Sequence, residues 1–241
     1  MRRRRAFVTM LIVAAGIPVP RPPARAASAE AALVFVHAGQ SLAALAPIYA
    51  LRRPLGLGIL PREPYSVEIS KDAPGHGVEP LLDLRIDAAG RLGTGAVGSV
   101  PRDGEIRRAV RDDFYSAPGV IGVRFDSVAG AVPRAEVLRD ALEIARARGV
   151  WLLGAPGGSE AAALARSLGI PVLAATDALD ERSSTDAVAS RVGTLIARAR
   201  RTGQAVGVAR LEGPAPAVIA KLLPAFDRAG VSLVPPSALL R

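Results

Sequence analysis

The chain has 241 residues, half of them hydrophobic, which is enough for an α/β domain with a sizeable buried core. It contains no cysteine, so disulfide bonds and thiolate metal sites or nucleophiles are excluded. The formal net charge of +9 falls by six to +3 without residues 1–26, which hold six arginines and no acidic residue, so the remainder has no electrostatic footprint for DNA or RNA.

Residues 1–26 have the layout of a secretory signal peptide. Arginines 2–5 precede an apolar run over residues 6–19, and small residues follow around Ala24 and Ala26. The run is shorter than the roughly 20 residues that a membrane span needs. The sequence therefore predicts cleavage, export to the periplasm by the Sec route, and a mature chain that is not integral to the membrane. The alternative is an uncleaved anchor, and RRAFV (4–8) weakly resembles a twin-arginine signal.

Residues 27–241 are predicted to form a single domain in which apolar strands alternate with amphipathic helices. The expected strands are 32–36, 55–60, 81–86, 119–123, 150–153, 171–174, 205–209 and 231–234. The expected helices are 41–51, 104–114, 134–148, 160–168, 185–202 and 215–229, and 62–80 is the least regular stretch. Continuous apolar strands predict a mostly parallel sheet covered by helices, with ligands at the carboxyl ends of the strands.

Two glycine-rich segments and two histidines are candidates for binding a nucleotide, an anion or a metal. The segment 93–98 matches G-x-G-x-x-G but does not follow a strand directly, so we interpret it as a loop. Gly157, Gly158 and Ser159 are expected to form a tight turn before a helix that Ser159 caps; the alternative is that their backbone amides hold an anion at the helix N-terminus. The segment contains no lysine, so it is not a Walker loop. Only His37 and His76 are present, which excludes a three-histidine zinc site, and His76 is expected to be an exposed imidazole without a role.

The C-terminal sequence LLPAFDRAGVSLVPPSALL (222–240) resembles the ending of the divergent polysaccharide deacetylase family, which is related to the NodB-type carbohydrate esterases. Segments 53–64, 119–130, 138–153 and 162–173 are similar to successive strand and helix units of that family, so the resemblance spans residues 31–240. It implies a distorted (β/α) barrel of about seven strands, a metal-dependent carbohydrate esterase fold.

The chemical motifs of that family are altered in this sequence. The resemblance implies a divalent ion held by one aspartate and two histidines, which polarises the acetyl carbonyl and activates water. Where the family has paired aspartates on the first strand, VHAG (36–39) stands here. DLRID (83–87) replaces the histidine motif of the third strand, RFD (124–126) replaces that of the fourth, and ARLEGP (209–214) replaces a Gly-His-Pro near the last.

Two functions are compatible with these changes. The first is an exported, catalytically inactive relative without a metal that binds or scaffolds cell-wall carbohydrate. Arg124, placed one residue past the strand, would fill the cation's space, and Phe125 would offer a stacking face to a sugar, unless both merely fill space. Arg210 is a third candidate ligand-binding residue. A periplasmic protein that binds a glycan or a partner protein without turnover overlaps with this function.

The alternative is an active deacetylase whose altered site consists of His37, Asp83 and Asp126. Such a carboxylate-rich set suits Zn or Mn, and it requires the three side chains to converge. Asp83 is equally well placed to pair with Arg85 or Arg124.

Overall fold

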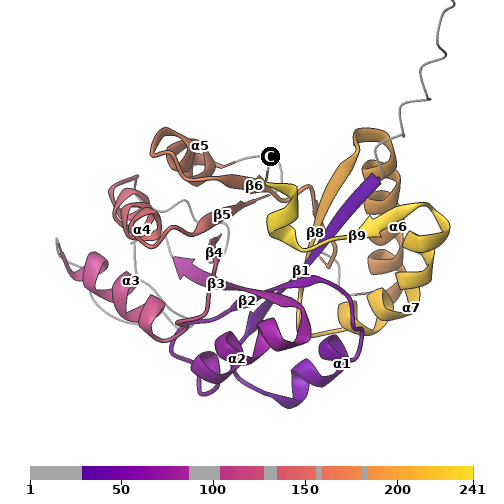
Figure 1. Ribbon diagram of the computed structural model, residues 1–241, viewed down its shortest axis with the longest axis horizontal. Helices are drawn as coiled ribbons and strands as arrows, with labels where there is room; N and C mark the ends of the chain where they lie inside the picture. The colour runs from indigo at the N-terminus through magenta and orange to yellow at the C-terminus, as the bar shows by residue number, and fades with distance from the viewer. Residues whose placement is uncertain (1–28, 87–103, 128–134, 156–158, 181–183, 241) are drawn as a thin grey trace, which may run out of the picture.

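A computed structural model describes residues 29–86, 104–127, 135–155, 159–180 and 184–240, arranged around one curled sheet (Figure 1). The strand order is β6-β5-β4-β3-β2-β1-β8-β7, with β9 paired to β1, and each of these pairings is parallel. The strands are β1 (Ala29–Ala38), β2 (Leu55–Ile59), β3 (Val78–Ile86), β4 (Gly122–Ser127), β5 (Trp151–Gly154), β6 (Val172–Ala174), β7 (Asp177–Ala178), β8 (Gln204–Arg210) and β9 (Val231–Leu233).

The two end strands of the sheet, β6 and β7, follow each other in the chain and are separated only by Ala175 and Thr176. The amide of Ala175 donates to the carbonyl of Gly154, the last residue of β5 (2.9 Å), and that of Thr176 donates to the Val206 carbonyl in β8 (2.8 Å). The same stretch of chain thus connects both edges of the sheet. This arrangement confirms the distorted (β/α) barrel, with β6 and β7 sharing one of about seven strand positions.

Helices cover the outer face of the sheet (Figure 1). They are α1 (Ala46–Tyr49), α2 (Ser66–Asp72), α3 (Glu105–Tyr115), α4 (Ala135–Ala147), α5 (Glu160–Ser167), α6 (Thr185–Thr202) and α7 (Ala215–Arg228), with 3₁₀ helices η1 (Ala43–Leu45), η2 (Ala73–His76) and η4 (Pro236–Leu239). The main core lies between helices and sheet and includes the buried rings of Phe35, Phe114 and Phe226. Burial on both faces explains why the strands read as continuous apolar runs.

The inner face of the sheet has a second, smaller core that the C-terminal segment closes. It contains Val34, Leu81, Trp151 and Leu239 among others. A Cβ at Gly56 would lie 2.9 Å from Pro236 Cγ, so this glycine lets η4 pack directly against the sheet. The Glu79 carboxylate accepts hydrogen bonds from the backbone amide and hydroxyl of Ser237. Apolar side chains and η4 therefore fill the barrel near the amino-terminal ends of its strands. Polar side chains inside the barrel lie near the carboxyl ends of the strands.

The structure corrects three sequence predictions. Residues 66–72, expected to be irregular, form α2 between Pro64 and Pro74, neither of which interrupts it. The helix expected over 41–51 is only η1 and α1, because the chain turns at Arg52, whose φ is +49°. β4 spans 122–127 rather than 119–123, which moves its charged residues into the strand.

Within the described ranges, no helix is long and apolar enough to cross a membrane. The predicted signal peptide lies outside those ranges.

Candidate functional site

Two charged residues of β3 face the inside of the barrel. Leu82 and Leu84 belong to the core under the helices, and side chains alternate along a strand. Asp83 and Arg85 therefore project toward the inner face, and Asp83 is fully buried there. A buried carboxylate is costly unless it is paired, so its partners define the site.

Those partners come from β4, whose charged residues lie within the strand and not after it. Val123 and Phe125 pack with the helix-side core, so Arg124 and Asp126 face inward. The parallel register places Arg124 beside Asp83 and Asp126 beside Arg85. The strand continues through these residues because opposite charges on the two strands neutralise one another across the ladder.

His37 reaches the same place through an irregularity of β1. Leu33 and Phe35 face the helices, and simple alternation would point His37 the same way. The register between β1 and β2 shifts between Phe35 and Ala38, and His37 has a φ of +68°, in the left-handed region. The shift returns Ala38 to the helix-side core and turns the imidazole into the barrel mouth. A strained backbone at a non-glycine residue is typical of functional sites.

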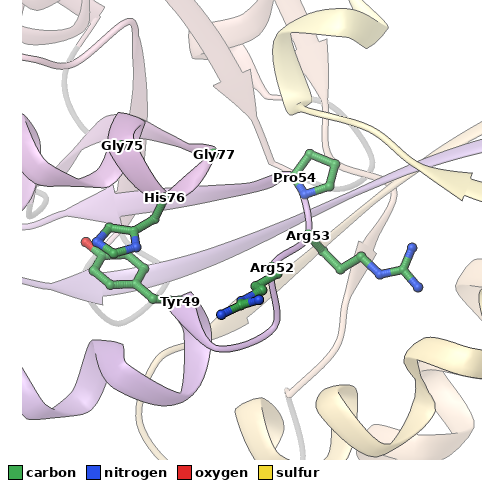
Figure 2. Close-up of a pocket in the computed structure, with 7 residues that line it drawn as sticks. All are labelled: Tyr49, Arg52, Arg53, Pro54, Gly75, His76 and Gly77. Atoms are coloured by element: carbon green, nitrogen blue, oxygen red, sulfur yellow. The ribbon is translucent and has the colours of Figure 1, made fainter.

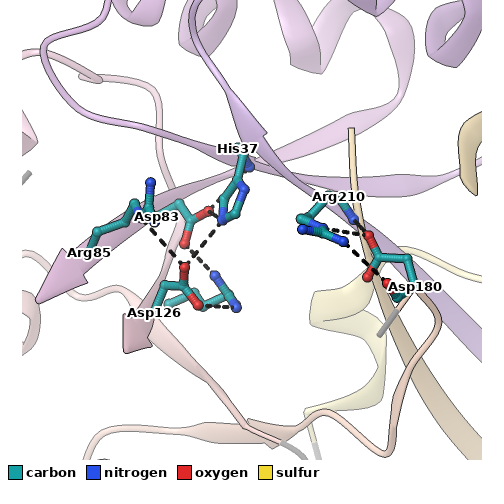
Figure 3. A network of polar contacts seen from close by, with 7 residues as sticks. His37, Asp83, Arg85, Asp126, Asp180 and Arg210 are labelled. Carbon is teal, nitrogen blue, oxygen red and sulfur yellow. Dashed lines mark hydrogen bonds and ion pairs between the residues drawn. The ribbon is translucent and has the colours of Figure 1, made fainter. Parts of the chain in front are cut away.

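His37, Asp83, Arg85, Arg124 and Asp126 form one polar network, named here the mouth network (Figure 3). Arg124 Nη1 donates to Asp83 Oδ1 (2.7 Å), and its Nη2 donates to Asp126 Oδ1 (2.8 Å). The His37 amide donates to Asp83 Oδ2 (3.2 Å). His37 Nε2 lies 3.2 Å from Asp126 Oδ2, and Arg85 Nε lies 3.6 Å from that same oxygen. Each of the four carboxylate oxygens therefore has a partner.

The electrostatics of the mouth network keep the Asp126 carboxylate ionised. Burial raises the pKa of Asp126, but the His37 hydrogen bond and the Arg124 charge outweigh it and lower this pKa to about 2. Burial lowers the pKa of Arg124, whereas Asp83 and Asp126 raise it above its ordinary value, so the guanidinium stays charged. Two aspartates are thus balanced by two arginines.

This balance bears on the divalent ion that the sequence resemblance implies. The three candidate ligands His37, Asp83 and Asp126 do converge, with His37 Nε2 3.8 Å from Asp83 Oδ2 and 3.2 Å from Asp126 Oδ2. However, the Arg124 guanidinium already pairs with one oxygen of each aspartate, Oδ1 in both cases. Among the described residues, no group of three or more His, Cys, Asp or Glu side chains is arranged to hold a metal ion. With Arg124 in place, the mouth network does not fit a divalent ion.

The other predicted ligand-binding residues lie apart from the mouth network. Phe125 is directed into the helix-side core, away from Arg124 and Asp126. Arg210 ends β8 beside Val36 of β1 and pairs with Asp180, with Nε donating to Oδ2 at 2.9 Å (Figure 3). Together with Glu212, Gly213 and Pro214, this pair lines a hollow of about 190 Å³.

The remaining candidates from the sequence have simpler structural roles. Ser159 caps α5 as expected, accepting a hydrogen bond from the Ala162 amide (3.1 Å). His76 does not lie free: its ring stacks on Tyr49 at 3.9 Å, and its Nε2 lies 3.2 Å from Asp72 Oδ2. The segment 93–98, Gly157 and Gly158 lie outside the described residues.

The sequence did not reveal the roles of two residues, Arg85 in the mouth network and Asp180 beside Arg210. Arg85 was considered only as a partner of Asp83, yet it lies next to Asp126. Its two-residue spacing from Asp83 signals a shared face. Asp180 was not noted at all, and no local pattern links it to Arg210, thirty residues later in the chain.

Comparisons with known proteins agree on the fold. Residues 33–240 match the family model described as divergent polysaccharide deacetylase. No curated protein sequence matches the chain. An uncharacterized protein from Agrobacterium tumefaciens superposes with a TM-score of 0.70 at 23% identity, covering 91% of this chain and 92% of that one.

Two further solved structures are more distant in sequence. A CE4 family pseudoenzyme from Bacillus anthracis has a TM-score of 0.55 at 12% identity, covering 89% of this chain and 66% of that one. The catalytic domain of a peptidoglycan N-acetylglucosamine deacetylase from Eubacterium rectale has a TM-score of 0.53 at 11% identity, covering 88% and 90%. At these identities the likeness concerns the fold.

Proposed function

The chain belongs to the divergent polysaccharide deacetylase family, and we propose that it is an exported, catalytically inactive member that binds cell-envelope carbohydrate at the mouth of its barrel. The observation that carries the proposal is the position of Arg124. Its guanidinium bridges Asp83 and Asp126, the two carboxylates that converge with His37. A side-chain cation thus stands between the groups that would otherwise be available to a divalent one.

The charge of the mouth network supports the loss of metal-dependent chemistry. A divalent ion would add two positive charges beside a guanidinium that is already neutralised, and it would have to displace the donors of both carboxylates. Deacetylation in this fold relies on a bound ion to polarise the acetyl carbonyl and to acidify water. None of the residues in the mouth network replaces that function, since Arg124 is held by two aspartates and His37 is hydrogen-bonded to Asp126.

A carbohydrate ligand is supported by the family and by the groups beside the mouth network. The solved structure from Eubacterium rectale is a peptidoglycan N-acetylglucosamine deacetylase, a protein that acts on a cell-wall glycan. In this chain, the hollow with Asp180, Arg210 and Glu212 offers charged donors and acceptors suited to sugar hydroxyls.

Export to the periplasm, where cell-wall glycans are accessible, is supported by the signal-like composition of residues 1–26. N-terminal sequencing of the protein recovered from a periplasmic fraction tests this directly. We expect the mature chain to begin near residue 27, whereas recovery of full-length protein with membranes would support the uncleaved anchor.

Catalysis and binding are tested together on the mature chain. It is incubated with N-acetylated chitin oligomers and peptidoglycan fragments in the presence of Zn²⁺ or Mn²⁺, and released acetate and bound glycan are measured. We expect acetate at the level of the protein-free blank and saturable glycan binding. R210Q should weaken that binding about tenfold through the loss of a charged hydrogen-bond donor, whereas R201Q on exposed α6 should not.

The second candidate is the active deacetylase with an altered site, which the convergence of His37, Asp83 and Asp126 favours. Metal-dependent acetate release that disappears in H37A would establish it and would overturn the proposal of an inactive protein. Such a change of state has a precedent in the fold: a mutant of the Bacillus anthracis pseudoenzyme has restored enzymatic activity.

A further inference from the structure

A second hollow lies at the amino-terminal ends of β2 and β3, whereas the mouth network lies at the carboxyl ends of the strands. Figure 2 shows the residues that line this hollow. It has a volume of about 470 Å³ and is lined by the turn before β2, Tyr49 to Pro54, and by the turn before β3, Gly75 to Gly77. This volume lies in the range of small-molecule sites. The proposed glycan binding at the mouth makes no use of it.

Arg52 is the feature that distinguishes this hollow. Its side chain is exposed and, within the described part of the chain, its guanidinium has no hydrogen bond or ion pair. Its backbone has a φ of +49°, a conformation that favours glycine, and its amide donates to the Tyr49 carbonyl (3.2 Å). The fold thus holds an arginine at a position where glycine would be less strained, and within the described residues its guanidinium makes no hydrogen bond or ion pair in return.

The neighbouring Arg53 behaves differently. Its Nη2 donates to Asp227 Oδ2 at 2.6 Å, and its side chain extends away from Arg52 (Figure 2). Arg53 therefore anchors the turn to α7, whereas the guanidinium of Arg52 extends toward the Tyr49 ring and is available to a ligand. In the part of the chain that the structure describes, these two adjacent arginines have one acidic partner between them, Asp227, so the turn has a positive potential.

The wall beside Arg52 is flat and preformed. The Tyr49 and His76 rings stack with centroids 3.9 Å apart and planes inclined by 6°. Asp72 lies 3.2 Å from His76 Nε2 and fixes the orientation of the imidazole, whose side chain is 42% exposed. The buried Tyr49 hydroxyl has no hydrogen-bond partner among the described residues.

We propose that this hollow binds a sugar that carries a carboxylate or phosphate group, with Arg52 holding the anion and the Tyr49–His76 pair contacting the sugar ring. A guanidinium is the side chain best matched to both oxyanions, because its parallel N–H groups bind two oxygens at once. Aromatic rings supply a rigid, largely apolar surface at little cost in conformational entropy. The site is separate from the mouth network, so binding here does not depend on the proposed function.

Calorimetric titration of the mature chain with glucuronate, glucose 6-phosphate, glucose and inorganic phosphate tests the proposal. We expect saturable binding of the two charged sugars, weakened by added salt, and at least about tenfold weaker binding of glucose and of phosphate alone. R52G should lower the affinity for the charged sugars about tenfold or more. Its melting temperature should equal or exceed that of the wild type, because glycine adopts the φ of this position without strain.

The control is R166Q, which removes one exposed arginine from α5 and should leave the affinity unchanged. Equal affinities of R52G and the wild type would overturn the assignment of Arg52, and absence of saturable binding to either charged sugar would overturn the site. Inorganic phosphate binding as tightly as glucose 6-phosphate would contradict the role of the Tyr49–His76 wall. R210Q, which removes the charged donor from the hollow near the mouth, should bind the charged sugars as the wild type does, so the two proposals fail separately.

Discussion

Asp126 in the mouth network and Asp113 in α3 are both aspartates that face an arginine, but the pKa of Asp126 is lowered to about 2 whereas that of Asp113 is raised to about 7. Asp113 is fully buried, and its Oδ1 lies 2.7 Å from Arg62 Nε. Neither oxygen of Asp113 accepts an aligned hydrogen bond from the described residues, and the Arg62 side chain is 49% exposed. Burial therefore outweighs the ion pair there.

Asp126 is largely removed from water, but each of its oxygens has a hydrogen-bond partner, Arg124 on one side and His37 on the other. An arginine nearby is therefore not sufficient to keep a buried carboxylate ionised, as Asp113 beside Arg62 shows. What matters is the number of aligned donors that replace its hydration. In the mouth network, the protein supplies that replacement itself, through Arg124.

The largest effect is expected from R124A. The variant leaves the fully buried Asp83 without its charged partner, and breaking a buried pair on one side costs about 3–5 kcal/mol of unfolding free energy. Urea denaturation at neutral pH measures this change. R85A is the matched control: it lies 3.6 Å from Asp126 in the same network, so it should cost about 1 kcal/mol or less. Equal decreases in the free energy of unfolding for R124A and R85A would contradict the claim that Arg124 is the main partner of the buried carboxylate.

An intermediate effect is expected from the titration of Asp113. Its pKa is about 7 in the folded state and about 4 in the unfolded state, so between these values only the folded state holds the proton. Stability contributed by protonated Asp113 is complete below about pH 4 and falls as the pH rises to about 7, by up to roughly 4 kcal/mol. Unfolding free energies measured across this range should fall in the wild type and change less in D113N. Parallel curves for the two proteins would contradict a raised pKa.

The smallest effect is expected at the acid end, from Asp126. Its lowered pKa means that its contribution is present above about pH 4 and is lost as the pH falls toward 2, by roughly 2 kcal/mol or less because the side chain is 20% exposed. D126N should therefore be less stable than the wild type at neutral pH, and the difference should shrink on acidification. A constant difference between about pH 2 and 6 would show that Asp126 is not held ionised.

The sequence predicted the fold far better than the details of the mouth network. Alternating apolar strands and amphipathic helices are properties of consecutive residues, and the resemblance to the family added the barrel. Both are confirmed. The convergence of His37, Asp83 and Asp126 was a requirement of the alternative altered site, and the structure does bring these three side chains together. The extension of β4 to Ser127 was not predicted. Arg124, Asp126 and Ser127 are typical of a loop unless the neighbouring strand carries charges opposite to theirs, as β3 does here.

The residues that sequence reasoning could not place depend on long-range geometry. His37 faces the mouth only because of a register shift and a left-handed φ, which no local pattern in VHAG shows. Phe125 was considered as a stacking face for a sugar or as a residue that fills space. Because side chains alternate along the extended β4, Phe125 points into the helix-side core. The hollow around Arg52 joins two turns that are far apart in the sequence, and the stacking of Tyr49 on His76 is visible only in the structure.

The central claim, that Arg124 stands in place of a divalent cation, is tested most directly by metal-dependent thermal stability. Melting temperatures of the wild type, R124A and the double variant D83N/R124A are measured with and without Zn²⁺ or Mn²⁺, and bound metal is quantified after dialysis. We expect the metal to stabilise R124A by mass action and to leave the other two proteins unchanged. A wild-type protein that retains about one equivalent of metal, and loses it in H37A, would contradict the claim.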